Sequence, residues 1–185
     1  MAVIAVVLAA GAGSRFEGPT HKLRAEHAGR PIVQLAIEAA VSAGIGPVLV
    51  VTGAEPLDDL LPPSVTEVRA PEWSSGQSRS LAAAIRAVEP TSAEAMVVGL
   101  GDMPGVTPGC WTAVAQAAAP IAVARYGGRL GPPVRLGREV WSELPSGGDE
   151  GARSLIRRRP ELVVEVPVPG DGRDVDTLED LRDLA

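Results

Sequence analysis

The stretch "VIAVVLAAGAGSR", residues 3–15, joins a run of apolar residues to a glycine-rich turn that ends in an arginine. A continuous apolar run bounded by such a turn indicates a strand that is buried on both faces. The small residues that follow let backbone N–H groups approach a ligand closely, as in turns that bind phosphate. The stretch therefore predicts an α/β fold with a ligand-binding turn at the end of its first strand.

Further apolar runs are predicted to be strands, at residues 47–53, 65–70, 95–100, 120–126 and 162–168. Helical stretches separate several of them, at residues 30–46, 76–88 and 107–119. Strands that alternate with helices form right-handed crossovers, so the pattern predicts a three-layer α/β fold, a mostly parallel sheet with helices on both faces. Residues 127–155 are rich in Gly and Pro, and we expect them to elaborate a single domain of residues 1–185.

The composition excludes several classes of function. Of the 185 residues, 45% are hydrophobic and 22% are charged, which is typical of a soluble globular protein. No apolar run reaches the roughly 18 residues that span a bilayer, and the first residues lack the features of a signal peptide. The net charge of −6 argues against a nucleic-acid polymer as partner. A single cysteine, Cys110, excludes an internal disulfide and is expected to be buried, so we expect a cytoplasmic protein without membrane contact.

Two common phosphate-binding loops do not fit the opening turn. A dinucleotide fingerprint needs a third glycine where this chain has Phe16, which argues against an NAD-dependent oxidoreductase. A Walker A loop needs a lysine where this chain has Pro19. What remains is L-A-A-G-x-G-S-R, followed by Lys22. The planar guanidinium of Arg15 and the compact ammonium of Lys22 suit the neutralisation of several phosphates, although two incidental surface cations are the simpler alternative.

Carboxylates follow the strand pattern at two places. Asp102, in "GDMP", comes directly after the apolar run 95–100, which places it at the carboxyl edge of the sheet, where α/β proteins bind ligands. Mg²⁺ prefers one or two carboxylates together with phosphate oxygens and water, so Asp102 is predicted to be a magnesium ligand. Asp174 and Asp176, in "DVDT", alternate onto one face, and their spacing does not choose between them as a second ligand.

Together these motifs resemble the MobA-like nucleotidyltransferases, a branch of the GT-A-like NTP transferases. The MocA-type molybdenum-cofactor cytidylyltransferases are the nearest branch. The resemblance runs nearly from end to end. It is carried by "LAAGAGSRF…HKL", "WSSGQSRSL", "GLGDMPGVTP", "GRLGPPV", "GGDEGARSL" and "DVDTLEDL". It implies a GT-A-like, Rossmann-like nucleotidyltransferase fold.

The resemblance also implies roles for individual residues. The implied nucleotide-binding residues are Leu8, Ala9, Ala10, Gly11, Gly13, Arg15, Lys22, Gly76, Ser80 and Asp102. Arg15, Lys22 and Asp102 are the implied catalytic residues, Asp102 and Asp176 the metal ligands, and Arg153 an acceptor-binding residue. Helix capping is the alternative role for Ser74 or Ser75, for Asp149 and for the segment Asp176–Thr177. The chain departs from the family at Ala70, where an asparagine is common, and at Pro132, where a histidine is common.

The implied reaction is Mg²⁺-dependent transfer of a nucleotide from an NTP to a small phosphorylated acceptor, with release of pyrophosphate. Ala10 favours CTP, because L-A-A-G is typical of the cytidylyltransferase-like members, and molybdopterin is the leading acceptor. Two alternatives with the same fold are a guanylyltransferase and a sugar-phosphate nucleotidyltransferase. A third alternative is a non-catalytic module that binds nucleotide or docks with a molybdoenzyme maturation partner.

Overall fold

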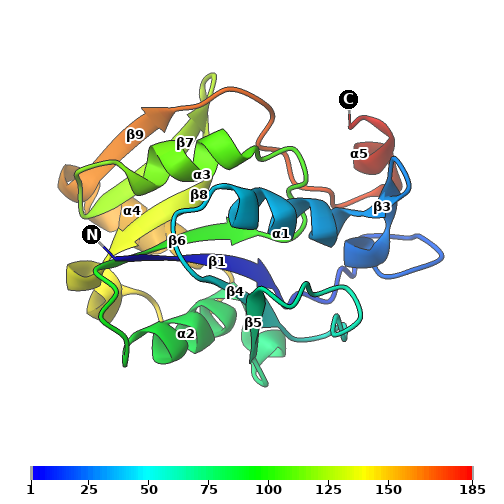
Figure 1. Ribbon diagram of the computed structural model, residues 1–185, viewed down its shortest axis with the longest axis horizontal. Helices are drawn as coiled ribbons and strands as arrows, with labels where there is room; N and C mark the ends of the chain where they lie inside the picture. Colours follow the sequence, from blue (N-terminus) through cyan, green and yellow to red (C-terminus); the bar gives the residue numbers. More distant parts are fainter. Residues whose placement is uncertain (1, 185) are drawn as a thin grey trace.

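The computed structural model describes residues 2–184 (Figure 1). Its strands are β1 (Val3–Ala9), β2 (Glu26–His27), β3 (Arg30–Pro31), β4 (Val48–Thr52), β5 (Val65–Arg69), β6 (Ala95–Leu100), β7 (Ile121–Tyr126), β8 (Arg129–Gly137) and β9 (Val163–Pro167). Seven of them form one sheet in the order β5-β4-β1-β6-β8-β7-β9, and β2 and β3 form a separate antiparallel pair. All neighbours in the large sheet are parallel except the two pairs that involve β8. The predicted mostly parallel sheet is confirmed.

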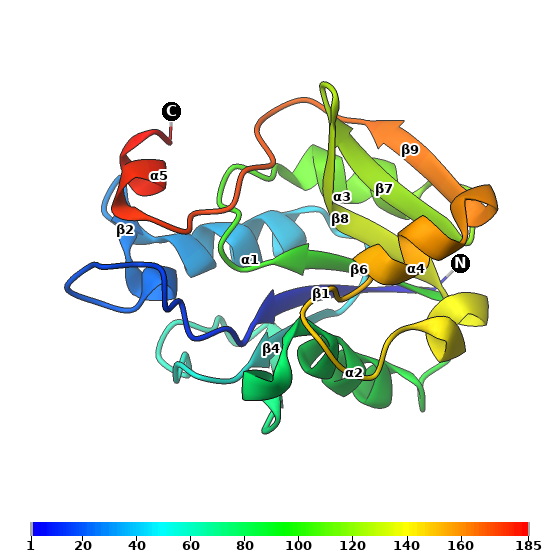
Figure 2. The ribbon, with the colours of Figure 1, turned by 180° about the vertical axis from the view of Figure 1, so that it is seen from behind.

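Helices cover both faces of this sheet, as predicted (Figures 1 and 2). The α-helices are α1 (Ile32–Ser42), α2 (Gln77–Val88), α3 (Pro108–Ala115), α4 (Arg153–Arg158) and α5 (Leu178–Arg182). Short 3-10 helices are η1 (Lys22–Arg24), η2 (Trp73–Ser75), η3 (Arg138–Glu143) and η4 (Pro160–Leu162). Successive side chains of β1 alternate between the two faces: Ala5 and Val7 pack with α1 and α3, whereas Val6 and Leu8 pack with α2. Every residue of β1 is buried, which explains its continuous apolar run.

β8 lies within the Gly- and Pro-rich segment 127–155, for which the sequence pattern predicted no particular strand. β8 is antiparallel to both of its neighbours and separates β6 from β7. Its ladder with β7 shifts register between the pairs Val123–Val134 and Ala124–Gly131. The two prolines between Gly131 and Val134 fall in this irregularity, where no ladder hydrogen bond is required of them. They interrupt the apolar pattern that would have revealed the strand.

The C-terminal helix α5 packs against the opening loop rather than against the sheet. Phe16 of that loop shares a small apolar cluster with Ile32 of α1, and with Val175 and Leu178 near the C-terminus. The Val175 N–H donates a hydrogen bond of 2.9 Å to the Asp102 carbonyl oxygen. These contacts bring the "DVDT" segment beside both the glycine-rich turn and the end of β6.

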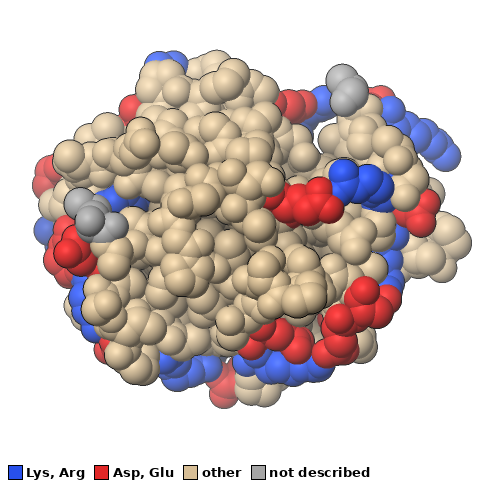
Figure 3. Space-filling model, viewed as in Figure 1, with Lys and Arg blue, Asp and Glu red and all other residues tan. Residues whose placement is uncertain are grey.

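Charged side chains lie mostly at the margin of the face covered by α1 and α3, and basic ones are interspersed with acidic ones there (Figure 3). Within residues 2–184, no helix is long and apolar enough to cross a membrane. Cys110 is fully buried in α3, as expected.

Candidate functional site

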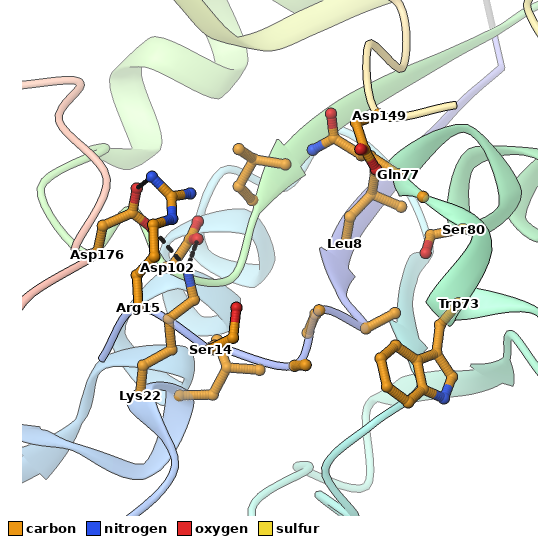
Figure 4. Close-up of a pocket in the computed structure, with 18 of the residues that line it drawn as sticks. Leu8, Ser14, Arg15, Lys22, Trp73, Gln77, Ser80, Asp102, Asp149 and Asp176 are labelled. Atoms are coloured by element: carbon orange, nitrogen blue, oxygen red, sulfur yellow. Dashed lines mark hydrogen bonds and ion pairs between the residues drawn. The ribbon is translucent and has the colours of Figure 1, made fainter. Parts of the chain in front are cut away.

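A cavity of about 390 Å³ opens at the carboxyl ends of β1 and β6 (Figure 4). It is named the first cavity below. Its walls come from the glycine-rich turn, from η2 and the start of α2, and from single residues after β6 and before α5. All ten residues for which the sequence implies a nucleotide-binding role line this one cavity. The parallel strands explain the convergence, because their carboxyl ends meet at one edge of the sheet.

One end of the first cavity holds a cluster of four charged residues, Arg15, Lys22, Asp102 and Asp176, named the ion cluster below. The Lys22 Nζ lies 2.6 Å from Asp102 Oδ2 and 3.0 Å from Asp176 Oδ1. A guanidinium nitrogen of Arg15 lies 2.7 Å from Asp176 Oδ2. The side chain of Arg15 is 75% exposed, whereas that of Lys22 is only 11% exposed. The cluster is therefore internally neutral, with one exposed cation and one buried cation.

Burial and charge act in opposite directions on the two most buried members. Burial raises the pKa of the Asp102 carboxyl above its ordinary value, and the nearby Lys22 ammonium opposes that rise. Burial alone would lower the pKa of Lys22, but Asp102 and Asp176 together outweigh it and raise the pKa above its ordinary value. Lys22 thus stays charged at neutral pH, with both carboxylates directed at it.

Local structure positions the side chains of Lys22 and Asp176. Lys22 opens η1, and His21 caps that helix by accepting the Leu23 N–H through Nδ1 at 3.3 Å. His21 is half-buried. Thr177 caps α5 in a capping box with Asp180, as one of the two alternatives had it, and this leaves the Asp176 carboxylate free for the cluster.

The ion cluster fits a divalent cation that brings further ligands with it. Asp102 Oδ1 is buried and has no hydrogen-bond partner within residues 2–184, so one oxygen of this carboxylate is available as a ligand. Asp176 contacts the same ammonium as Asp102, whereas Asp174 is exposed and does not line the cavity. The described residues offer no group of three or more metal-binding side chains. Two carboxylates completed by phosphate oxygens and water match the coordination that Mg²⁺ prefers.

The other end of the first cavity, named the Trp73 end below, has no cation, and the exposed Asp149 is its one charged side chain. Figure 4 shows Trp73 and Ser80 on the side away from Arg15 and Asp176. Trp73 was not singled out by the sequence analysis. It is half-buried, whereas Trp111 and Trp141 are 2% and 6% exposed, so it alone among the tryptophans faces this cavity. A tryptophan directly before "SSGQSRSL" was the available signal.

The loop at residues 147–151 packs directly against the start of α2. Gly76 has a φ of +105°, and a Cβ there would lie 2.5 Å from the Gly148 carbonyl oxygen, so only glycine fits. The Ser78 N–H donates a 3.0 Å hydrogen bond to that same oxygen. Asp149 consequently lines the first cavity, and the alternative of Asp149 as a helix cap is wrong, since Ala152 is the N-cap of α4.

A second cavity, of about 270 Å³, adjoins the first and shares Leu8, Gln77 and Leu100 with it. It lies over the sheet between α2 and α4, and apolar side chains make up most of its wall. Arg153, the residue with an implied acceptor-binding role, lines this second cavity and not the first. Pro132, where the family commonly has a histidine, lines it too.

Comparison with known proteins shows to which family a chain with these features belongs. The family model that describes the MobA-like NTP transferase domain matches residues 5–163. No curated protein sequence matches the chain. Among solved structures, Rv0371c from Mycobacterium tuberculosis H37Rv is 29% identical with a TM-score of 0.84, over 98% of this chain and 96% of that one. The structure of Rv0371c in complex with manganese is 26% identical to this chain with a TM-score of 0.84, over 100% of this chain and 98% of that one. A CMP:2-keto-3-deoxy-manno-octonic acid synthetase complexed with CTP shares the fold at 17% identity and a TM-score of 0.75, over 100% and 97%.

The matched residues include the glycine-rich turn, Lys22 and Asp102, whereas Asp176 lies beyond them. The match covers well over half of the chain, and the fold is similar to that of Rv0371c over 98% of the chain. The chain therefore belongs to the MobA-like NTP transferase domain family and is an enzyme of the nucleotidyltransferase class.

Proposed function

We propose that this protein transfers CMP from CTP to a small phosphorylated acceptor, with Mg²⁺ as cofactor, and releases pyrophosphate. The observation that carries the proposal is the division of the first cavity into the ion cluster at one end and the largely uncharged Trp73 end at the other. A nucleoside triphosphate has the same division. Its phosphates would lie at the ion cluster, and its base and ribose would lie toward Trp73 and Ser80.

The glycine-rich turn joins the two ends and would follow the nucleotide along its length. Gly11 lines the cavity, and a Cβ at this position would face open space, so a ligand can approach the backbone there. Gly13 has a φ of +62°, which turns the chain toward Lys22. Ala10 is buried beside the Trp73 end, and the resemblance to cytidylyltransferases makes it the residue that favours CTP.

Asp102 and Asp176 would hold the Mg²⁺. The bound ion would neutralise charge on the triphosphate and so assist departure of pyrophosphate. The manganese complex of Rv0371c supports a divalent metal in this fold. Both carboxylates already contact Lys22, so that ammonium has to leave at least one of them when the nucleotide and the metal bind.

Arg15 and Lys22 would turn from the carboxylates to the triphosphate and stabilise its developing charge. A phosphate oxygen of the acceptor attacks the α-phosphorus, the bond from that phosphorus to the bridging oxygen breaks, and pyrophosphate leaves with the electron pair. The acceptor phosphate is already ionised at neutral pH, so the attack requires no general base. Positioning and charge neutralisation are then the main contributions of the protein.

The acceptor would occupy the second cavity, with its anionic group toward Arg153. The shared wall of Leu8, Gln77 and Leu100 supports this arrangement, because it brings the two substrates side by side. Molybdopterin is the leading acceptor on the resemblance to MocA-type enzymes, and Ala70 and Pro132 mark where this chain departs from them. The buried Cys110 suits the cytoplasm, where we place the protein.

Pyrophosphate release tests the proposal directly. The purified chain, with Mg²⁺, is given each of the four common NTPs and a panel of phosphorylated acceptors that includes molybdopterin. We expect the highest kcat/KM with CTP, and no turnover without the metal. A preference for GTP would make the protein a guanylyltransferase. Tight nucleotide binding without turnover would instead support a non-catalytic module that docks with a molybdoenzyme maturation partner.

A further inference from the structure

The second cavity offers few hydrogen bonds to whatever fills it. Only four of its lining side chains are polar, namely Gln77, Glu150, Arg153 and Arg157. The carboxylate of Glu150 accepts hydrogen bonds of 2.7 Å at both oxygens from Arg157, which occupies these two residues with each other. Gln77 and Arg153 therefore remain as the side chains available to hydrogen-bond a ligand.

The apolar wall extends from the core to the surface. Its deep part includes Val98, Val123 and Val134 on one face of the sheet. At its outer part lies Leu130, which is 42% exposed. The other large apolar side chain that is exposed within residues 2–184 is Val164, on β9, and it does not line the cavity. Burial of Leu130 beneath an apolar group would be favourable.

A single available cation accompanies this wall. The side chain of Arg153 is exposed and makes no hydrogen bond or ion pair within residues 2–184, in a protein whose net charge is −6. An unpaired guanidinium at the edge of an apolar cavity is suited to one anionic group on an otherwise apolar ligand.

We infer that the acceptor is a phosphate ester whose body is apolar or a flat ring with few hydroxyls, and is not a sugar or polyol phosphate. This inference rests on the proposed function, since it names the acceptor class for the same site. Each hydroxyl of a sugar would lose water on entering the cavity, and Gln77 and Arg153 are too few to replace that water for every hydroxyl, which opposes binding. A flat heterocycle meets the requirement when its polar edge lies at the shared wall near Gln77.

Cyclohexyl phosphate and myo-inositol 1-phosphate form a matched pair of probes, because they share the carbon ring and the phosphate and differ in five hydroxyls. Their dissociation constants are measured by calorimetry on the full chain, with Mg²⁺ and a non-cleavable CTP analogue. We expect cyclohexyl phosphate to bind at least about 10-fold more tightly. Equal binding, tighter binding of the inositol phosphate, or no binding of either probe would overturn the inference.

Leu130 and Val164 supply matched variants, since both side chains are exposed and neither supports the core. Leu130→Asn should weaken binding of cyclohexyl phosphate about 5-fold and leave inositol phosphate unchanged. Val164→Asn should change neither affinity. Arg153→Gln should weaken both probes equally, because both carry the same phosphate. An unchanged preference in Leu130→Asn would contradict the assignment of this cavity.

Failure of the inference is distinguishable from failure of the proposed function. Pyrophosphate release with inositol phosphate, but not with cyclohexyl phosphate, would keep the transferase and overturn the acceptor class. A strong preference for cyclohexyl phosphate in binding, without pyrophosphate release from any NTP, would support the acceptor class and contradict nucleotidyl transfer.

Discussion

The two cavities share a wall but differ in almost every physical property. The first contains the ion cluster, in which two carboxylates and two cations neutralise one another, together with the exposed Asp149. The second is mostly apolar, and within residues 2–184 it has an Arg157–Glu150 ion pair and the unpaired Arg153. Charged groups cost free energy to bury and hold their geometry through partners, so the first cavity is suited to a highly charged ligand and to charge development during reaction. Apolar side chains discriminate between ligands only by the shape and polarity of those ligands. Under the proposed function, reactivity would therefore reside in the first cavity and acceptor choice in the second.

Removal of one charge from the ion cluster should give the largest effect. Asp102→Asn keeps the size of the side chain but removes the charge that a divalent cation requires. We expect kcat to fall by at least about 100-fold, in line with lost charge stabilisation of a few kcal/mol. Asp174→Asn is the matched control, because Asp174 is exposed and outside the cavity, and its turnover should stay near normal. Near-normal pyrophosphate release by Asp102→Asn would contradict the assignment of Asp102 as a metal ligand.

Substitutions of Arg15 and Lys22 should have different effects, because the two cationic groups differ in geometry. Arg15→Lys keeps the charge but loses the planar fork, and we expect kcat to fall about 30-fold. Lys22→Arg should be milder than Lys22→Ala, because a charge remains near the phosphates. Steady-state kinetics together with NTP affinities would test this. If alanine at either position weakened NTP binding and left kcat intact, these residues would only anchor the substrate.

The second cavity should respond differently. Arg153→Ala is expected to raise the KM for the acceptor about 10-fold, through loss of one charge-assisted contact, while the KM for CTP stays unchanged. Arg86→Ala serves as a control, since Arg86 is exposed like Arg153 but lines neither cavity. An equal rise in both KM values for Arg153→Ala would show that the two cavities do not divide the substrates in this way.

Base choice should depend on a smaller interaction. Ala10→Gly removes one methyl group beside the Trp73 end of the first cavity, and we expect the preference for CTP over GTP to narrow about 3-fold. Calorimetry with each NTP and Mg²⁺ gives the ratio of affinities. A preference that stayed the same would move base selection to another wall residue, of which Trp73 is the next to substitute.

The pH dependence of stability tests the confinement of Lys22. Burial raises the pKa of Asp102, and loss of the opposing ammonium in Lys22→Met would raise it further. A carboxyl whose pKa is higher in the folded than in the unfolded protein adds stability as the pH falls through the folded value. The Tm deficit of Lys22→Met against the parent should therefore shrink by about 2–4 °C between about pH 7.5 and about pH 5.

The control for this measurement is Arg15→Met, because the side chain of Arg15 is largely exposed. Its Tm difference from the parent should not vary across the same pH range. A deficit of Lys22→Met that stayed constant with pH would mean that the buried Asp102 does not depend on the Lys22 ammonium.

Much of the fold was predictable because it is local in origin. β1 is Val3–Ala9, the apolar part of the stretch 3–15, and β4, β5, β6, β7 and β9 differ from prediction by one residue at either end at most. α3 begins at Pro108, inside the predicted helical stretch 107–119, and Thr107 is its N-cap residue. In each case the signal lies in the spacing of neighbouring apolar residues and in a capping or turn residue beside them. β8 escaped because glycine and proline interrupt its pattern where the ladder is irregular.

The sequence by itself determined the strands, most helices, and the residue types at the end of each strand, Lys22 and Asp102 among them. Only the tertiary structure decided that Asp176 rather than Asp174 joins the ion cluster, that Trp73 faces the first cavity, and that an apolar cavity adjoins it. The physical reason is distance along the chain: Lys22 meets Asp102 across 80 residues and Asp176 across 154. Local periodicity carries no record of such contacts, which arise when α5 packs against the opening loop and β8 enters the sheet.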